Sequence, residues 1–323
     1  PLPDQADVLI VGSGYTGLNA GLVTARSGLN TVIVDAESAG WGCSSRNGGQ
    51  LSGEIKPSYA ELSRKYGHDR ACAIVLEARK GLDWIGEFIR TEAIDCDFKR
   101  SGRLHAAHSP RQFALQAHEF RHQTKGLELA GHLVEKADLR SEIDSPFYHG
   151  GLVIDSHASL DPARYHQGLY DRALTSGCQV IGNCKVTSIK RKREGFDVIT
   201  GQGRIRAGKV IIATSGYTGS ATPWHQRRII PIGSYMIATE AFDTELMAKH
   251  PTADLLPRLD SRSSLTNIPL SAKTAPRLTT CSAHCRSGIH PRSIRPTASM
   301  SSKTAHGSSL PSSGELSLLW GPA

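Results

Sequence analysis

The chain has 323 residues, of which 39% are hydrophobic and 21% charged, and it has no run of about 18 apolar residues that would span a membrane. Its net charge of +8 lies mostly in residues 261–323, which carry +6, whereas residues 1–260 carry only +2. These values predict a soluble protein with two intertwined lobes, and they exclude a membrane partner and, because the nearly neutral body lacks the basic face of a nucleic-acid binder, a nucleic-acid partner.

The first predicted elements are a strand, a glycine-rich turn, a helix and a second strand. Residues 7–11 have the pattern of a short buried strand, and the small and apolar residues that follow predict a helix that ends before Gly28. Residues 31–34 are apolar and β-branched, which predicts a second strand. Together these elements occupy fewer than 40 residues, as a βαβ unit requires.

The turn between the first strand and the helix carries the pattern G-x-G-x-x-G in Gly12, Gly14 and Gly17. In this context the first glycine permits a tight turn, the second lets the backbone approach a pyrophosphate, and the third lets helix and strand pack closely. The exposed N–H groups and the dipole of the helix start, at Tyr15 and Thr16, are then expected to hold the phosphates.

Asp35 stands 18 residues after Gly17, at the end of the second predicted strand. We expect its carboxylate to accept hydrogen bonds from the ribose diol of an adenosine, and to repel a 2′-phosphate, which disfavours NADP. The pattern alone does not separate FAD from NAD. A glycine turn and an acid at a strand end also occur by chance in doubly wound sheets.

The remaining predicted elements leave this unit and then return to it. Helices are expected at residues 59–66, 71–90 and 112–130, and strands at 100–107 and 151–154, which together suggest an α+β lobe. A helix opens at Asp161 and Pro162 and runs to about Ser176, before Gly177. Strands follow at residues 179–181, 186–189, 196–200 and 209–213.

The loop at residues 40–50 distinguishes FAD from NAD. Its sequence is Gly-Trp-Gly-Cys-Ser-Ser-Arg-Asn-Gly-Gly-Gln. This sequence resembles the FAD-dependent D-amino-acid oxidase family, in particular the gamma-glutamylputrescine oxidase-like branch, where G-x-G-x-S-x-R-N-G-G follows the acidic residue that binds the ribose. The small residues let the loop close over pyrophosphate and flavin, while Ser44 and Arg46 offer a hydroxyl and a fixed cation. The resemblance covers roughly residues 6–250 and implies FAD contacts from Gly42, Ser44, Arg46, Asn47, Gly48 and Gly49.

Two later segments also resemble this family. Residues 184–189 are similar to the strand whose valine backbone meets the adenine, which implies a contact from Val186. Residues 209–214 are similar to the strand that closes over the dinucleotide, which implies contacts from Ala213 and Thr214. Residues 215–219 repeat the Ser-Gly-Tyr-Thr-Gly of residues 13–17. They lack the first glycine, however, and Pro223 blocks a long helix, so no second dinucleotide site is predicted.

The cysteines and histidines are expected to have structural rather than catalytic roles. Cys43 is expected to pack near the flavin rather than to form a covalent thioether, and His105, His108 and His225 are expected to be isolated surface or satisfied histidines. Seven scattered cysteines form no disulfide framework, which favours a cytoplasmic location. No metal site is predicted, because the cluster at Cys281, His284, Cys285 and His290 lacks the paired spacing of zinc fingers.

The resemblance implies oxidation of an amine or amino acid. In the family, a neutral amine delivers a hydride to flavin N5, the imine hydrolyses, and oxygen reoxidises the flavin and leaves as peroxide. This chemistry requires orientation of the substrate rather than a strong acid or base, so no catalytic residue is assigned. The alternatives are an inactive truncated flavoprotein fragment and an NAD-dependent dehydrogenase, which the loop at residues 40–50 disfavours.

The predicted fold is therefore α/β, with a Rossmann-like FAD-binding domain and an interleaved α+β substrate lobe. The expected boundaries are 1–97 and 156–224 for the two parts of the FAD-binding domain, 98–155 for the first part of the substrate lobe, and 225–260 for the start of its second part. Residues 261–323 contain 15 Ser and six Thr, with neither helical nor strand periodicity. They are expected to be disordered or degraded, either as a basic tail or, as the abrupt change favours, through a shifted reading frame.

Overall fold

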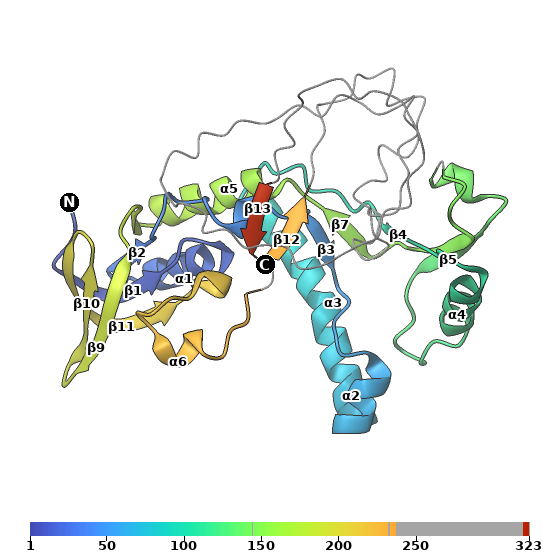
Figure 1. The fold of residues 1–323 in the computed structure, drawn as a ribbon, viewed down its shortest axis with the longest axis horizontal. Helices are drawn as coiled ribbons and strands as arrows, with labels where there is room; N and C mark the ends of the chain where they lie inside the picture. Colours follow the sequence, from blue (N-terminus) through green and yellow to red (C-terminus); the bar gives the residue numbers. More distant parts are fainter. Residues whose placement is uncertain (144, 232, 237–318, 323) are drawn as a thin grey trace, which may run out of the picture.

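A computed structural model describes residues 1–143, 145–231, 233–236 and 319–322. The described part is elongated, with a six-stranded sheet at one end and a three-stranded sheet at the other (Figure 1). A pair of helices, α2 (Tyr59–Tyr66) and α3 (His68–Thr91), projects from the region between the two sheets. The chain passes from the larger sheet to the smaller one and back, and the predicted α/β fold class is confirmed.

The six-stranded sheet contains the predicted βαβ unit at its centre. Its order is β8 (Gln179–Ile181), β2 (Thr31–Val34), β1 (Gln5–Val11), β11 (Gly203–Ile212), β10 (Gly195–Thr200) and β9 (Val186–Lys192). The first four strands run parallel, and β10 runs antiparallel to both of its neighbours. All four residues of β2 are buried, as expected for a parallel strand that is covered on both faces.

Two helices of this domain pack together on one face of the sheet. They are α1 (Tyr15–Arg26) and α5 (Pro162–Thr175), and their apolar residues form one core with β1 and α3. The start of α5 is capped by Asp161, whose Oδ1 accepts hydrogen bonds from the N–H groups of Ala163 and Arg164 at 2.9 and 3.1 Å. Proline just inside the helix and the cap at Ser176 agree with the predicted start and end.

The opposite end of the molecule is an antiparallel sheet of order β4 (Arg103–Ala106), β6 (Gly150–Ile154) and β5 (Gly131–Glu135). Helix α4 (Pro110–Arg121) lies against β6, where the ring of Phe113 occupies the space that a Cβ at Gly150 would need. The core of this part is small, with seven buried residues, namely Leu104, Ala106, Val134, Leu139, Ile143, Tyr148 and Val153.

The helix predicted at residues 112–130 is wrong in its second half. Helix α4 ends at Arg121, and the next residues form a turn in which the Leu127 N–H donates to the Thr124 carbonyl and Gly126 has a φ of +83°. A glycine with that backbone conformation interrupts a helix. Strand β5, which the prediction lacked, follows this turn.

Short elements connect the two ends. Strand β3 (Gln50–Ser52) pairs antiparallel with β7 (His157–Ser159) between the large sheet and the three-stranded one. Helix α6 (Pro223–Gln226) begins at Pro223 and has only four residues, so no long helix directly follows the turn at residues 215–219, as predicted. The 3-10 turns are η1 (Cys43–Ser45), η2 (Leu139–Ser141) and η3 (Ser215–Tyr217).

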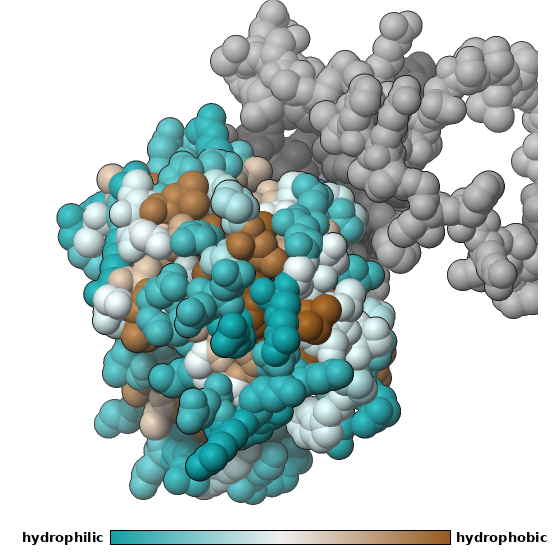
Figure 2. Space-filling view, turned by 90° about the vertical axis from the view of Figure 1, so that its left-hand side faces the viewer, coloured by the Kyte–Doolittle hydropathy of each residue, from teal (hydrophilic) through white to brown (hydrophobic). Residues whose placement is uncertain are grey.

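The tail expected at residues 261–323 lies outside the described residues except for 319–322. Those four depart from the expectation, because β13 (Leu319–Pro322) pairs antiparallel with β12 (Gly233–Met236). The end of the molecule that carries the six-stranded sheet has a mainly hydrophilic surface, with hydrophobic residues in separate patches (Figure 2). Within the described part of the chain, none of the helices combines the length and the apolar character that a membrane span requires.

Candidate cofactor site

The residues predicted to bind a dinucleotide begin where three parallel strands end. Gly12 follows β1, Asp35 follows β2 and Ala213 follows β11. The Gly12 N–H donates to the Val34 carbonyl and the Ala213 N–H donates to the Val11 carbonyl, each at 2.8 Å. In open parallel sheets, ligands bind at this carboxyl edge of the strands.

The three glycines of the turn occupy positions where a side chain does not fit. A Cβ at Gly12, whose φ is +106°, would lie 2.5 Å from the Ala213 carbonyl oxygen, and a Cβ at Gly17 would lie 1.8 Å from the Gly12 carbonyl oxygen. Gly17 therefore sets the close contact between α1 and the turn. Gly14 is the N-cap of α1 and supplies no side-chain cap, so the positive end of the helix dipole faces the edge of the sheet.

Asp35 holds the glycine turn in place. Its Oδ2 accepts hydrogen bonds from the backbone N–H and the hydroxyl of Ser13, both at 2.7 Å, and its Oδ1 accepts one from the Glu37 N–H at 3.1 Å. The side chain is half-buried. An ionised carboxylate has about four acceptor positions, so acceptor capacity remains for a ligand hydroxyl.

A buried histidine that sequence reasoning missed supports the same turn. His166 is 4% exposed, and its Nε2 lies 2.8 Å from the Ser13 carbonyl oxygen. A Cβ at Gly40 would lie 3.2 Å from the His166 ring, so this side chain touches both the turn and the loop after β2. His166 comes from α5, 153 residues after Ser13, and no local pattern in the sequence connects the two.

The loop at residues 42–49 is fastened to α1 and to the start of α5. The Asn47 side-chain amide donates to the Tyr15 hydroxyl at 3.3 Å and to the Cys43 carbonyl at 3.1 Å, and the Gly49 N–H donates to Asn47 Oδ1 at 2.9 Å. Gly49 has a φ of +63°, and a Cβ there would lie 2.0 Å from the Leu160 carbonyl oxygen. Asn47 and Gly49 therefore fix the loop's path.

Ser44 contacts the start of α1, whereas Gly48, in the same loop, is exposed. The Ser44 hydroxyl accepts a hydrogen bond from the Tyr15 N–H at 3.1 Å, which places it at the first turn of α1. A Cβ at Gly14 would lie 2.9 Å from the Ser44 Oγ, so Gly14 makes this approach possible. Gly48 is exposed, and a Cβ there would meet no atom within 4 Å.

Arg46 points back to its own loop. Its guanidinium donates to the Trp41 carbonyl and lies 5.0 Å from the centre of the Trp41 ring, while its Nε donates to the Gly42 carbonyl at 3.5 Å. Trp41 also meets Tyr217 edge to face at 5.7 Å. Burial raises the pKa of the Tyr217 hydroxyl. The contacts of Trp41 with Arg46 and Tyr217 thus join the loop to η3, which follows Ala213.

The last predicted residues lie on the same edge. Cys184 donates its N–H to the Asp35 carbonyl at 2.7 Å, which places buried Val186, two residues later, near the end of β2. The Thr214 and Thr218 hydroxyls share a hydrogen bond at 2.7 Å. Thr16 is exposed on the first turn of α1. The structure thus arranges all the predicted residues around the glycine turn and the loop that faces it.

Comparison with known proteins decides the family. Residues 7–269 match the family model described as DAO, FAD dependent oxidoreductase. The chain belongs to the DAO family of FAD-dependent oxidoreductases. The family resemblance drawn from the loop at residues 40–50 is therefore confirmed, and FAD is the cofactor of this family.

Two curated relatives in the DAO family are considerably longer than the region that matches this chain. Gamma-glutamylputrescine oxidoreductase of Escherichia coli (strain K12) is 32% identical over 245 residues, which cover 74% of this chain and 56% of that protein. The probable oxidoreductase OrdL of Haemophilus influenzae is 28% identical over 242 residues, which cover 73% and 56%. The chain thus spans little more than half the length of these DAO relatives.

Solved structures share the DAO fold at low sequence identity. Glycine oxidase from Geobacillus kaustophilus aligns with a TM-score of 0.59 and 18% identity, over 72% of this chain and 61% of that one. An FAD-bound L-alpha-glycerophosphate oxidase from Mycoplasma pneumoniae aligns with a TM-score of 0.53 and 19% identity, over 64% and 53%. These likenesses support the fold of the cofactor domain.

The edge described above fits the FAD that the DAO family binds. A dinucleotide needs a backbone turn without side chains, the N-terminus of a helix, and an acid at the end of the second strand. Gly12, Gly14 and Gly17 provide the turn, the start of α1 after its N-cap Gly14 provides the helix N-terminus, and Asp35 is the acid. The residues present therefore suit FAD.

A cavity of about 240 Å³ lies between Tyr15, Asn47, Trp84 and Tyr165, so it is lined partly by residues of the loop and of α1. Burial raises the pKa of Tyr165 to about 12 and also raises that of Tyr15, so both hydroxyls are neutral at ordinary pH. This volume is below that of typical ligand pockets and far too small for a dinucleotide.

The expectation that His105 is isolated is wrong. Its ring lies 5.9 Å from that of His157, centre to centre and edge to face, and Glu54 is beside both. His105 and His157 are 52 residues apart in the sequence, on strands that pair with different partners. Periodicity and spacing do not reveal such an association.

Proposed function

We propose that this chain binds FAD at the carboxyl edge of β1, β2 and β11 and forms part of an enzyme that oxidises an amine or amino acid. The observation that carries the proposal is the meeting of the glycine turn, Asp35 and the loop at residues 42–49 at one edge of the sheet. FAD supplies, when bound, the N5 atom that accepts a hydride from the substrate, and oxygen is the proposed final acceptor, with release of peroxide.

The proposed roles follow from the positions of the residues. Gly12, Gly14 and Gly17 admit the pyrophosphate to the start of α1, where the Thr16 N–H faces it and the Tyr15 N–H holds the Ser44 hydroxyl beside it. Asp35 accepts hydrogen bonds from the adenosine ribose. The backbone of Val186 lies beside the adenine, Ala213 and Thr214 close over the dinucleotide, and Gly42, Arg46, Asn47, Gly48 and Gly49 cover pyrophosphate and flavin.

Ser44 has a defined chemical role in this proposal. Its oxygen already accepts the Tyr15 N–H at 3.1 Å. A serine hydroxyl has one donor and two acceptor positions, so the Ser44 O–H is left to donate to a phosphate oxygen. The Tyr15 N–H thus holds Ser44 in place, and the Ser44 hydroxyl presents the donor to the pyrophosphate.

The substrate lobe is assigned on the same basis. Residues 1–97 and 156–224 form the proposed FAD-binding domain, residues 98–155 the first part of the substrate lobe, and residues 225–260 the start of its second part. Relatives named for their substrates, gamma-glutamylputrescine and glycine, support an amine or amino acid as the substrate class. The chain's own contribution is to bind and orient, because hydride transfer requires no strong acid or base from the protein.

The activity is tested with the FAD-loaded chain. Under anaerobic conditions, addition of polyamine-derived or amino-acid substrates should bleach the flavin absorbance, and readmitted oxygen should restore it with formation of peroxide. A chain that binds FAD but is reduced by none of these amines would favour the alternative of an inactive flavoprotein fragment. A chain that binds NAD in place of FAD would favour a dehydrogenase.

A further inference from the structure

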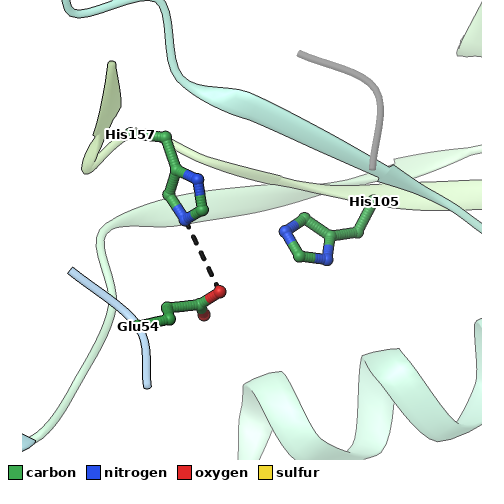
Figure 3. A group of neighbouring side chains, drawn as sticks. All are labelled: Glu54, His105 and His157. Carbon is green, nitrogen blue, oxygen red and sulfur yellow. Dashed lines mark ion pairs between the residues drawn. The ribbon is translucent and has the colours of Figure 1, made fainter. Parts of the chain in front are cut away.

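Glu54, His105 and His157 form a cluster outside the cofactor site. Their ligand atoms, one oxygen and two ring nitrogens, all lie within 4.8 Å of one another. His157 Nε2 is 3.5 Å from Glu54 Oε2, and the three side chains point into a common space (Figure 3). The cluster joins three segments, because Glu54 follows β3, His105 lies on β4 and His157 lies on β7.

Strand pairing fixes two of these positions. His157 is paired with Ser52 in the β3–β7 ladder, and its carbonyl accepts a hydrogen bond from the Gly102 N–H at 3.1 Å. His105 is paired with Leu152 in the β4–β6 ladder. The backbone therefore presents both imidazoles to the same place.

Burial gives the cluster a closed side and an open side. The His157 side chain is 3% exposed, His105 is half-buried, and the Glu54 side chain is 37% exposed. An ion could enter past Glu54, and a coordination position facing solvent would remain for water.

The charges of the cluster suit a cation. Glu54 supplies a carboxylate whose Oε2 lies 3.5 Å from His157 Nε2. Arg103, on the same strand as His105, places a positive charge near Glu54 that opposes binding of a metal ion. The Ser52 hydroxyl, 3.4 Å from His157 Nε2, is a competing partner for that nitrogen.

We propose that Glu54, His105 and His157 bind one divalent cation of the zinc class. Two imidazoles and one carboxylate are a set of three protein ligands that zinc accepts, with a fourth position for water. Tetrahedral ligation at about 2.0–2.1 Å requires the ligand atoms to lie roughly 3.3 Å from one another. The ligand atoms now lie within 4.8 Å of one another, so small side-chain rotations must bring them closer when the ion binds. The bound ion fastens the segment after β3 to β4 and β7. This inference does not depend on the proposed function.

The test measures metal affinity in the full chain. Chelator-treated protein is titrated with Zn²⁺ against a chromophoric chelator, and with Co²⁺ by visible absorbance, for the wild type, Glu54→Gln and His105→Gln. We expect one tight Zn²⁺ site per chain, and a loss of affinity of roughly tenfold or more in each variant. The Co²⁺ spectrum of the wild type should show four-coordinate absorption that Glu54→Gln loses. His157 is left unchanged because its burial makes a folding defect the expected result.

An exposed histidine pair at the end of α4 provides the matched control. His118 and His122 are separated by one helical turn, with ring centres 4.2 Å apart, which is a geometry that captures Zn²⁺ adventitiously. The double variant His118→Ala/His122→Ala should keep the tight site. The proposal is overturned if the wild type takes up no tightly bound Zn²⁺, if Glu54→Gln and His105→Gln bind as the wild type does, or if the control loses the site.

Discussion

At the scale of single residues, Asp35 has two roles, because it holds the glycine turn and, on our proposal, binds the ribose of FAD. It receives two hydrogen bonds from Ser13 and one from Glu37, and on our proposal it also receives the ribose hydroxyls. Its charge thus contributes both to the shape of the glycine turn and to the binding of FAD. Asp7 provides a control for the loss of a carboxylate. It lies on β1 away from the candidate site, where its side chain accepts the Asn30 N–H at 2.8 Å.

Asp35→Ala should weaken FAD binding by about 1–3 kcal/mol, through loss of charge-assisted hydrogen bonds to the ribose. The measurement is calorimetric titration with FAD of the wild type, Asp35→Ala and Asp7→Ala. Asp7→Ala removes the same charge and a backbone hydrogen bond, yet should leave the FAD affinity unchanged. Equal affinities for the wild type and Asp35→Ala would remove Asp35 from the site.

Two glycines with opposite surroundings provide a second prediction. A Cβ at Gly17 would lie 1.8 Å from the Gly12 carbonyl oxygen, whereas a Cβ at Gly81, on the exposed face of α3, would meet nothing within 4 Å. Gly17→Ala should destabilise the fold by about 1–3 kcal/mol through overpacking, and Gly81→Ala should stabilise it by up to about 1 kcal/mol through helix propensity. Denaturant unfolding measures both. A Gly17→Ala protein as stable as the wild type would show that α1 does not pack as described.

The glycine turn shows what can be read from local sequence. Its three glycines, Asp35 and the capped start of α5 were all predicted, because each depends on residues within a few positions or on a well-known motif. The His166 contact with Ser13 and the cluster of Glu54, His105 and His157 were not predicted. Their members are 51 to 153 residues apart, and only the completed fold brings them together.

At the scale of elements, an ion pair joins the ends of two helices. Arg26, at the end of α1, donates to both carboxylate oxygens of Glu92, just after α3, at 2.7 and 2.8 Å. This bond holds the pKa of Glu92 below its usual range, and Arg26's own pKa is raised. A carboxyl group with a lowered pKa in the folded state adds stability above its unfolded pKa, which is lost as the pH falls through the folded value.

Glu92→Gln should therefore lower the free energy of unfolding at pH 7 and have a smaller effect at acid pH. The unfolded pKa of a glutamate is about 4.3, so the difference between the wild type and the variant should shrink below that pH. Urea unfolding at neutral pH and at pH values below about 4 measures the difference. The Arg26 side chain is 47% exposed, so we expect a modest effect at neutral pH. A difference that grows as the pH falls would contradict the account.

The elements also show where prediction from sequence fails. The strands of the parallel sheet were predicted because their apolar β-branched runs are buried on both faces. Strand β5 was missed because its five residues have only one that is fully buried, Val134, so the period-2 signal is weak. The helix predicted at residues 112–130 is too long because Gly126, whose φ is +83°, turns the chain after α4 has ended at Arg121.

At the scale of the whole molecule, the described chain has a six-stranded sheet, which carries the candidate cofactor site at its edge, and a smaller three-stranded sheet. The cores that cover the two faces of the six-stranded sheet are larger than the core of the three-stranded sheet. The DAO relatives are longer than this chain, and the matched region covers 56% of each of the two compared above.

The most direct test of the account is the affinity of the purified chain for FAD and for NAD under the same conditions. Titration of each cofactor, followed by calorimetry and by flavin absorbance, should show binding of one FAD and little or no binding of NAD, because we propose that the loop at residues 42–49 covers a flavin. The affinity for FAD should fall in Asp35→Ala and persist in Asp7→Ala. A folded protein that binds NAD tightly and shows no flavin absorbance after incubation with FAD would contradict the central claim.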